Sequence, residues 1–289
     1  MKKFLFVLVL GIGIFAVTNF SKKGKVVKNA VTSYVMPASN INRSGNTVNT
    51  RVKAPNGYER ILPQSASFSS YIHYYKLKDY GAEVINYDGN PYWYQAGHVG
   101  VLEVPVPSNG LQQCADALIR LRAEYLWDKN QKDQIGFKFT SGHYCSWTKY
   151  AEGYRPKVKG NNVTFSKTAT SNHTKDNFYN YLNLIYTYAG TYSLSQELQK
   201  ISNLQDVQIG DMLVYPGFPG HIMMIGDIVE NAEGERLFLF FQGNTPAQSV
   251  HIIKNASEPL KSPWYSLKGK QSLETPIYTF DSFELVRFK

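Results

Sequence analysis

Hydrophobic and polar residues alternate most regularly in the last third of the chain. From Asp206 onward, short apolar runs separated by turn residues predict β-strands. The expected strands are residues 211–215, 221–229, 236–242, 248–253 and 277–288. Earlier in the chain, residues 97–107 alternate in the same way, and Phe68–Tyr75 is an aromatic run of β-type composition. Most of the predicted sheet therefore comes from the C-terminal part of the chain.

Helical periodicity is clearest in residues 109–127, NGLQQCADALIRLRAEYLW. Asn109, with Gln112 three residues later, resembles a capping box, so this helix is expected to begin at Asn109. Its apolar residues recur at helical spacing and predict a buried stripe. The stripe consists of Leu111, Cys114, Ala115, Leu118, Leu121 and Tyr125. Two more helices are expected, at residues 175–189 and from Ser193 to Lys200.

The order of these elements predicts the fold class. Strands come first, then a helix, loops, two helices and a final run of strands, so the chain lacks the repeated strand–helix–strand order of a parallel sheet. We predict an α+β fold in which an antiparallel sheet packs against helices. One domain is expected to cover residues 52–289.

The N-terminal region has the composition of an export signal followed by a linker. Two lysines precede an uncharged apolar run over residues 4–17. A run of about 14–17 residues is short for a membrane span, so residues 1–20 are predicted to be either a cleaved signal peptide or a membrane anchor. Residues 21–51 are polar and predict a flexible tether. We therefore expect an exported protein of the periplasm or cell envelope, with residues 4–20 as its membrane tether if the signal is retained.

The net charge of +9 is confined to this region. Residues 1–60 contain ten Lys and Arg residues against Glu59 alone, whereas residues 61–289 contain 21 basic and 21 acidic residues. A groove for a phosphate backbone needs an excess of basic residues in the folded part of the chain. We therefore expect no nucleic-acid partner.

The segment from Gln208 to Gln242 contains the strongest candidate for chemistry. His221 follows Pro219-Gly220 and begins a long apolar strand, and a histidine in this place can accept a proton from a nucleophile that faces it. Gln242 ends the next strand, and in an antiparallel hairpin it falls near His221, where its amide can set the imidazole tautomer. Asn244 is a second candidate for that role. The alternative is that His221 is a strand-end histidine bonded to a backbone carbonyl.

Only two cysteines are available as nucleophiles. Cys114 lies near the start of the helix predicted at 109–127, where amide dipoles lower the pKa of a thiol. It also belongs to the apolar stripe, as a buried structural cysteine does. Cys145 lies in a loop beside His143. The two cysteines can instead form a disulfide, which would leave neither thiol reactive.

No metal site or cofactor is expected. The six histidines are scattered, and neither the HExxH nor the CxxC spacing occurs. The 21 tyrosines and four tryptophans, including YWYQ at 92–95 and Trp147, are candidates for a surface that binds glycan or peptide.

Seven strings of the sequence resemble an uncharacterised family of exported Bacteroidota proteins. They are LQQCADALIRLRAEYLW, FTSG, WTKYAEGYR, YAGTYSLSQEL, QIGDMLV, PGHIMMIGD and PAQSVHIIKN. The resemblance covers about residues 52–289. It implies no activity, because the family has no established one.

A remoter resemblance covers residues 208–245. The glycine-aspartate step, the glycine-histidine pair and the following strand with a polar end are similar to papain-like cysteine amidases of the NlpC and CHAP types. This resemblance implies a papain-like core with Cys114 as nucleophile, His221 as base and Gln242 as its orienting partner. The sequence departs from those families around the cysteine, where Gln113 precedes it and Ala115 follows it.

Two functions follow as expectations. The first is a cell-envelope cysteine amidase or peptidase that acts on cell-wall peptide or a similar amide. The second is a catalytically inactive envelope protein that binds peptide, peptidoglycan or glycan.

Overall fold

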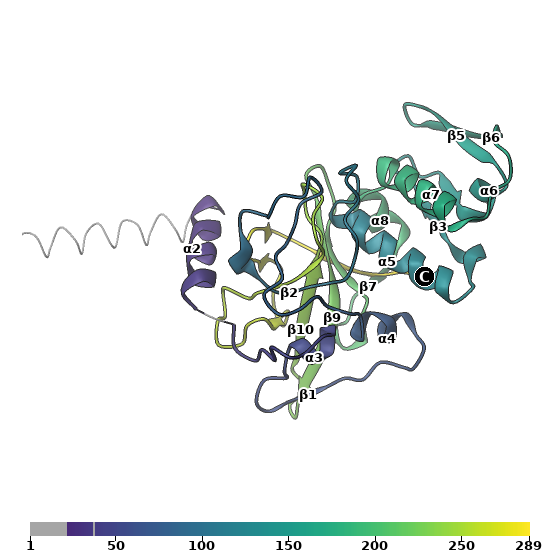
Figure 1. Cartoon of the computed structure of the whole chain (residues 1–289). Helices are drawn as coiled ribbons and strands as arrows, with labels where there is room; N and C mark the ends of the chain where they lie inside the picture. Colours follow the sequence, from purple (N-terminus) through teal and green to yellow (C-terminus); the bar gives the residue numbers. More distant parts are fainter. Residues whose placement is uncertain (1–21, 37) are drawn as a thin grey trace, which may run out of the picture.

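A computed structural model describes residues 22–36 and 38–289. The predicted signal or anchor, residues 1–20, lies outside the described residues. A nine-stranded sheet forms the centre, in the order β2-β11-β10-β9-β8-β15-β7, with β1 paired to β9 and β12 paired to β10 (Figure 1). Its paired strands are antiparallel. The prediction of one compact α+β domain with an antiparallel sheet is confirmed.

The central sheet consists of short strands around two long ones, β9 and β10. Its strands are β1 (Tyr58–Arg60), β2 (His98–Val101), β7 (Gln199–Ile201), β8 (Met212–Tyr215), β9 (His221–Asn231), β10 (Arg236–Gln242), β11 (His251–Ile253), β12 (Tyr265–Ser266) and β15 (Glu284–Arg287). Three hairpins lie apart from it: β3 (Gly136–Lys138) with β4 (Tyr144–Ser146), β5 (Tyr154–Lys159) with β6 (Asn162–Lys167), and β13 (Leu273–Glu274) with β14 (Thr279–Phe280).

The α-helices are α2 (Lys22–Val35), α3 (Val48–Arg51), α4 (Phe68–His73), α5 (Cys114–Asp128), α6 (Trp147–Ala151), α7 (Lys175–Tyr188) and α8 (Thr191–Glu197). Short 3-10 turns cover Gln95–Gly97, Lys132–Gln134 and Leu204–Asp206. None of the helices in the described part of the chain is long and apolar enough to span a membrane.

The aromatic run expected as a strand is the helix α4, so that prediction is wrong. Ser67 caps the helix by accepting a hydrogen bond from the backbone N–H of Ser70 at 3.1 Å. Phe68 and Tyr71 then pack against Tyr125 of α5, with ring centroids 5.3 and 5.5 Å apart. Packing and capping outweigh the β-propensity of aromatic residues in this run.

The long helix begins five residues later than the sequence predicts. Gly110 has φ +71°, which is outside the helical region, and Asn109 uses its side chain to accept from Leu111 N–H. The helix starts at Cys114, with Gln113 as the capping residue and Asp116 Oδ2 accepting from Gln113 N–H at 3.0 Å. Cys114 is therefore the first residue of α5, five residues after the predicted start of the helix.

Two of the predicted C-terminal strands are also shorter than expected. The strand predicted at 248–253 covers only His251–Ile253, and the one predicted at 277–288 divides into β14 and β15. β14 pairs with β13, whereas β15 lies between β8 and β7 in the central sheet. The segment predicted as one strand thus contributes strands to two different sheets.

The folded part begins before residue 52, contrary to the predicted boundary. Val48 and Arg51 of α3 are buried, and the Arg51 guanidinium donates to the backbone carbonyls of Gly45 and Lys78 at 2.8 and 2.9 Å. The segment expected as a flexible tether also contains α2. This helix contacts the C-terminal part of the domain through an ion pair of 2.6 Å between Lys25 and Glu274.

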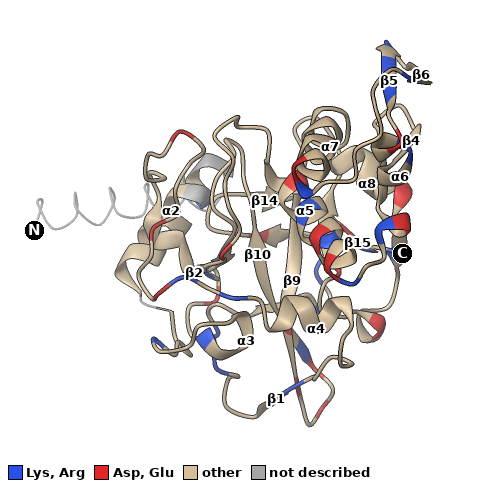
Figure 2. Ribbon diagram, turned by 45° about the vertical axis from the view of Figure 1, so that its right-hand side comes forward, with Lys and Arg blue, Asp and Glu red and all other residues tan. Residues whose placement is uncertain are grey.

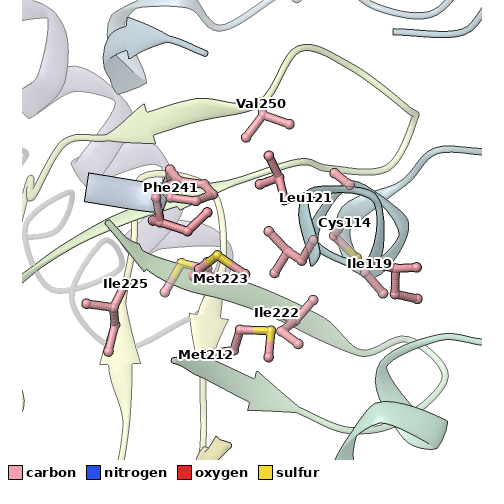
Figure 3. Close-up of a cluster of buried hydrophobic side chains, with 14 of the residues drawn as sticks. Cys114, Ile119, Leu121, Met212, Ile222, Met223, Ile225, Phe241 and Val250 are labelled. Carbon is pink, nitrogen blue, oxygen red and sulfur yellow. The ribbon is translucent and has the colours of Figure 1, made fainter. Parts of the chain in front are cut away.

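The two faces of the central sheet have different neighbours. On one face, which we call the helix face, α5 packs against β9 and β10, and Phe241 lies with Leu121 and Cys114 in one apolar cluster (Figure 3). On the other, the C-terminal face, Phe240 contacts Tyr265 with ring centroids 5.6 Å apart. Both faces are therefore covered, which explains why β9 and β10 are almost continuously apolar.

Candidate functional site

A bulge in β9 brings His221 and Gln242 to the same face of the sheet. Leu239 pairs with Asp227 but Phe240 pairs with Ile225, so Gly226 is an extra residue on β9. Continuing the register beyond the bulge places Gln242 opposite Met223, two residues from His221. Residues two apart on a strand share a face. Without the extra residue, Gln242 would point to the opposite face from His221.

The side chains of the pair meet in a buried hydrogen bond. His221 Nε2 and Gln242 Oε1 are 2.7 Å apart, and both side chains are buried. On the C-terminal face the imidazole packs against the rings of Tyr278 and Phe280, at centroid distances of 4.8 and 5.6 Å. Burial lowers the pKa of His221 to about 4, with the hydrogen bond that Gln242 Oε1 accepts opposing that effect, so the imidazole is neutral at pH 7.

The buried polar cluster extends to His251. Gln242 pairs with His251 across β10 and β11, and Gln242 Nε2 lies 3.4 Å from His251 Nε2. His251 Nδ1 is 2.9 Å from the backbone oxygen of Ser249. Desolvation lowers the pKa of His251 to about 4 as well. The cluster therefore carries no charge at neutral pH.

His98 of β2 lies at the far end of this cluster. A second bulge, at Val99, brings it to the face of His251, with ring centroids 6.0 Å apart. Its Nε2 lies 3.3 Å from Gln95 Oε1, and burial lowers its pKa to about 3. Two bulges thus align three histidines and one glutamine on a single face of the sheet.

Sequence reasoning missed His98 and His251. Each was one of six scattered histidines, and no local motif distinguishes them. The available signal was the distance of each residue from a loop. Gln242 and His251 lie on consecutive strands, close to the loop that joins them. These two residues pair directly, whereas the bulges at Gly226 and Val99 bring His221 and His98 to their face. An isolated glycine within a strand pattern is the only local sign of the first bulge.

Cys114 lies beside the first residues of β9. It is the first residue of α5, its thiol is hydrogen-bonded to the backbone N–H of Ile222, and Ile222 is the residue after His221. Alternation turns the Ile222 side chain toward α5 (Figure 3). Among the described residues, no hydrogen bond joins the Cys114 thiol to the His221 imidazole; the cysteine contacts β9 through its backbone.

The thiol of Cys114 is protonated at rest. The side chain is 7% exposed, and desolvation, together with the nearby Asp116 carboxylate, raises its pKa to about 12. Hydrogen bonds from the backbone N–H groups at the start of α5 and of Ile222 act in the opposite direction. Asp116 is itself buried, and desolvation raises the pKa of its carboxyl to about 8. Its Oδ1 has no hydrogen-bond partner.

The other candidate residues lie apart from Cys114 and His221. Cys145 and Cys114 are both free thiols, so the disulfide considered from the sequence is absent. Cys145 is buried in the β3–β4 hairpin, where Tyr181 donates to its backbone carbonyl at 2.9 Å. Asn244 accepts a hydrogen bond from Thr245 N–H at 2.8 Å rather than contacting the imidazole. Within residues 22–36 and 38–289, His, Cys, Asp and Glu side chains form no group of three that could hold a metal ion.

The strand segments that carry His221 and Gln242 are apolar and uncharged. Neither residues 221–226 of β9 nor residues 237–242 of β10 include a charged side chain. Figure 2 shows the charged residues mainly on helices, on loops and toward the opposite ends of these strands. The neutral imidazole keeps a free lone pair that can accept a proton, although its lowered pKa makes it a weaker base than an ordinary histidine.

Comparisons of the chain with curated proteins and with solved structures found no match. One protein family does match, over residues 48–287. This match begins at the first residue of α3 and therefore includes the helix that the sequence-based boundary left out. The chain belongs to this family, which is described as Domain of unknown function (4846).

Proposed function

We propose that this domain is a cysteine hydrolase of amide bonds, with Cys114 as nucleophile, His221 as general base and Gln242 as the residue that orients the base. One observation supports it above all. His221 Nε2 is held by Gln242 at 2.7 Å, which leaves Nδ1 for a thiol, and the thiol of Cys114 contacts the next residue of the same strand.

The chemistry requires a proton transfer between neutral groups. Sγ of Cys114 attacks the amide carbon while its proton passes to Nδ1 of His221. The imidazolium then gives that proton to the leaving amine, and a thioester remains on Cys114. Water, deprotonated by the same imidazole, hydrolyses the thioester to a carboxylic acid and restores the thiol.

The start of α5 supplies the electrostatic part of the proposal. The backbone N–H groups of the first helical turn have no partner within the helix, and their dipoles favour negative charge. Cys114 occupies this first turn, so an oxyanion formed on a substrate bonded to Sγ would lie close to these donors. The papain-like resemblance of residues 208–245 is consistent with this arrangement.

The proposed substrate is a peptide amide of the cell envelope. The apolar run after two N-terminal lysines supports export, and an exported hydrolase meets cell-wall peptide there. The proposal further requires that Sγ and Nδ1 come within hydrogen-bond reach when substrate binds, because Cys114 packs on the helix face whereas the His221 side chain points to the C-terminal face. It also requires that the site open, because Cys114 is 7% and His221 3% exposed.

The competing proposal is a catalytically inactive protein that binds glycan or peptide. A separate cavity of about 440 Å³ favours it. Tyr71, Tyr74 and Tyr75 line this cavity together with Lys76 and Glu103. Aromatic rings beside charged groups suit sugar and peptide ligands. In this second case Cys114 is a core residue and His221 a buried structural histidine.

Thiol alkylation distinguishes the two proposals, and the chain contains its own control. With iodoacetamide and mass spectrometry, the rates at Cys114 and Cys145 are followed in one sample; Cys145 is also buried, with its pKa raised to about 12. The hydrolase proposal predicts faster alkylation at Cys114, lost by about tenfold or more in His221→Ala because a general base contributes about 10²–10⁴-fold. Equal slow rates at both cysteines in both proteins contradict it.

Substrate turnover provides the direct test. Purified peptidoglycan is incubated with the wild type and with Cys114→Ser, and released peptides are identified by mass spectrometry. The hydrolase proposal expects new amine and carboxyl ends with the wild type alone. Binding of peptidoglycan without cleavage by either protein favours the inactive alternative, and Tyr74→Ala then tests the tyrosine-lined cavity.

A further inference from the structure

We propose that His251 is a positioning residue that fixes the tautomer of His221 through Gln242. This inference rests on the proposed function for its catalytic meaning, but the hydrogen-bond chain it describes exists whether or not the protein is an enzyme. The chain runs from the backbone carbonyl of Ser249 through His251 and Gln242 to His221.

The first step is fixed by a backbone carbonyl. The oxygen of Ser249, 2.9 Å from His251 Nδ1, can only accept a hydrogen bond, so Nδ1 must carry a proton. His251 is buried and its imidazole is neutral at pH 7, so it carries a single proton. Its Nε2 is therefore an acceptor.

The second step sets the orientation of an amide. The oxygen and nitrogen of a glutamine side chain can be exchanged by a half-turn, and hydrogen bonding decides between the two orientations. Since His251 Nε2 accepts, the Gln242 Nε2–H group must face it, at 3.4 Å. The reverse orientation would place two acceptors against each other in a buried site. Gln242 Oε1 consequently faces His221.

The third step assigns the base. Gln242 Oε1 accepts at 2.7 Å, so His221 Nε2 carries the single proton of that neutral imidazole. His221 Nδ1 then has the free lone pair that the proposed reaction needs to take a proton from Cys114. Had the amide been reversed, Nδ1 would carry the proton and could not act as a base.

This chain of three bonds depends on the strand register. Gln242 and His251 are direct partners across β10 and β11, and the bulge at Gly226 brings His221 to their face. All three side chains are at most 4% exposed, so water does not compete for these bonds. A glutamine alone orients a histidine in either tautomer; the second histidine removes that ambiguity.

Two substitutions at His251 separate its role as the hydrogen-bond acceptor for Gln242 from the role of the remainder of its side chain. His251→Asn keeps a donor near the Ser249 carbonyl but is too short to accept from Gln242. His251→Gln extends far enough to place an oxygen where Nε2 lies. The readout is the ¹⁵N spectrum of histidine-labelled protein, which distinguishes a protonated Nδ1 from a protonated Nε2 at His221, with His221→Gln identifying the signals.

The wild type is expected to show His221 protonated at Nε2 alone. In His251→Asn we expect a mixture of both tautomers and about tenfold slower alkylation of Cys114, a part of the about 10²–10⁴-fold that a general base contributes. His251→Gln is expected to restore the single tautomer and the rate. Persistence of the Nε2–H tautomer in His251→Asn overturns the inference.

Two other outcomes can be distinguished from a change of tautomer: a general loss of stability, and failure of the hydrolase proposal. Ile252→Ala is the matched control, because it removes buried side-chain atoms from the same strand on the opposite face and should leave the His221 tautomer unchanged. If the tautomer responds to His251→Asn while the alkylation of Cys114 is slow in every variant, the positioning role stands and the hydrolase proposal fails.

Discussion

His221 of β9 and Gln242 of β10 share one face of the sheet because Gly226 is an extra residue between them and the β-turn. The hydrogen bond of 2.7 Å that joins them is buried on all sides. A glycine in mid-strand thus determines which side chain a strand-end histidine meets. This dependence on register makes the pair testable by substitutions that act on its bonds and by others that act on the backbone.

Removing the acceptor should destabilise the domain even if the pair has no catalytic role. In Gln242→Leu, His221 Nε2–H and His251 Nε2 both lose their partner inside a closed site. We expect a loss of about 1–3 kcal/mol in the free energy of unfolding, the usual cost of leaving a buried polar group unpaired. Urea denaturation of the variant and of Met223→Leu, a nearly isosteric change on the same face, measures it. Equal stabilities of the two variants would contradict the prediction.

The bulge itself can be tested at Gly226. A Cβ at this position would lie 3.0 Å from side-chain atoms of both Phe241 and Val48, closer than ordinary contact. We expect Gly226→Ala to cost about 1–3 kcal/mol, as overpacking of a core usually does. Gly234→Ala is a useful comparison, since its Cβ would meet nothing within 4 Å, although its φ of +76° adds backbone strain.

In spectroscopic terms, the same substitution should disturb the His221–Gln242 bond. If Phe241 moves aside, its neighbour Gln242 moves with it, and the ¹⁵N signals of His221 should change in Gly226→Ala but not in Gly234→Ala. If Gly226→Ala loses the expected stability but the His221 signals do not change, the bulge does not determine the geometry of the His221–Gln242 hydrogen bond.

Buried neutral histidines predict a specific response to acid. Burial lowers the folded-state pKa of His221 and His251 to about 4, below the value of about 6.5 in an unfolded chain. The unfolded chain therefore binds more protons between these values, and the contribution of both residues to stability, complete above pH 6.5, is lost as the pH falls toward 4. Urea denaturation at pH 5 and pH 7 should show lower stability at pH 5, with a smaller difference in His251→Gln.

Much of the fold was predictable from the sequence, because β9 and β10 are apolar runs bounded by turn residues and α7 has helical periodicity. His221 and Gln242 were identified as neighbours by counting back from the turn between their strands. The start of α5 was not predictable in the same way, since Asn109 offers a capping pattern and only the positive φ of Gly110 rules it out. His251 could not be identified either, because its contact with Gln242 depends on pairing between β10 and β11, and the bulge that brings His221 to the same face leaves almost no trace in the local pattern.

From the buried carboxyl of Asp116 we expect stability to depend on pH in the opposite direction to that expected from the histidines. Desolvation raises its folded-state pKa to about 8, above its usual value of 3.8, so the folded protein binds the extra proton between these values. Its contribution to stability is complete below pH 3.8 and is lost as the pH rises toward 8. Asp116→Asn keeps an oxygen that can accept from Gln113 N–H while removing the ionisable group.

We therefore expect Asp116→Asn to be more stable than the wild type at pH 8.5, with the difference shrinking as the pH is lowered to 5. Thermal unfolding across this range measures it, and Asp133→Asn, in an exposed position before β3, is the control that should follow the wild type. The substitution also removes the negative charge that helps to raise the pKa of Cys114, so alkylation of Cys114 at pH 8.5 should become faster. A variant less stable than the wild type at pH 8.5 would show that the carboxylate is satisfied in the folded protein.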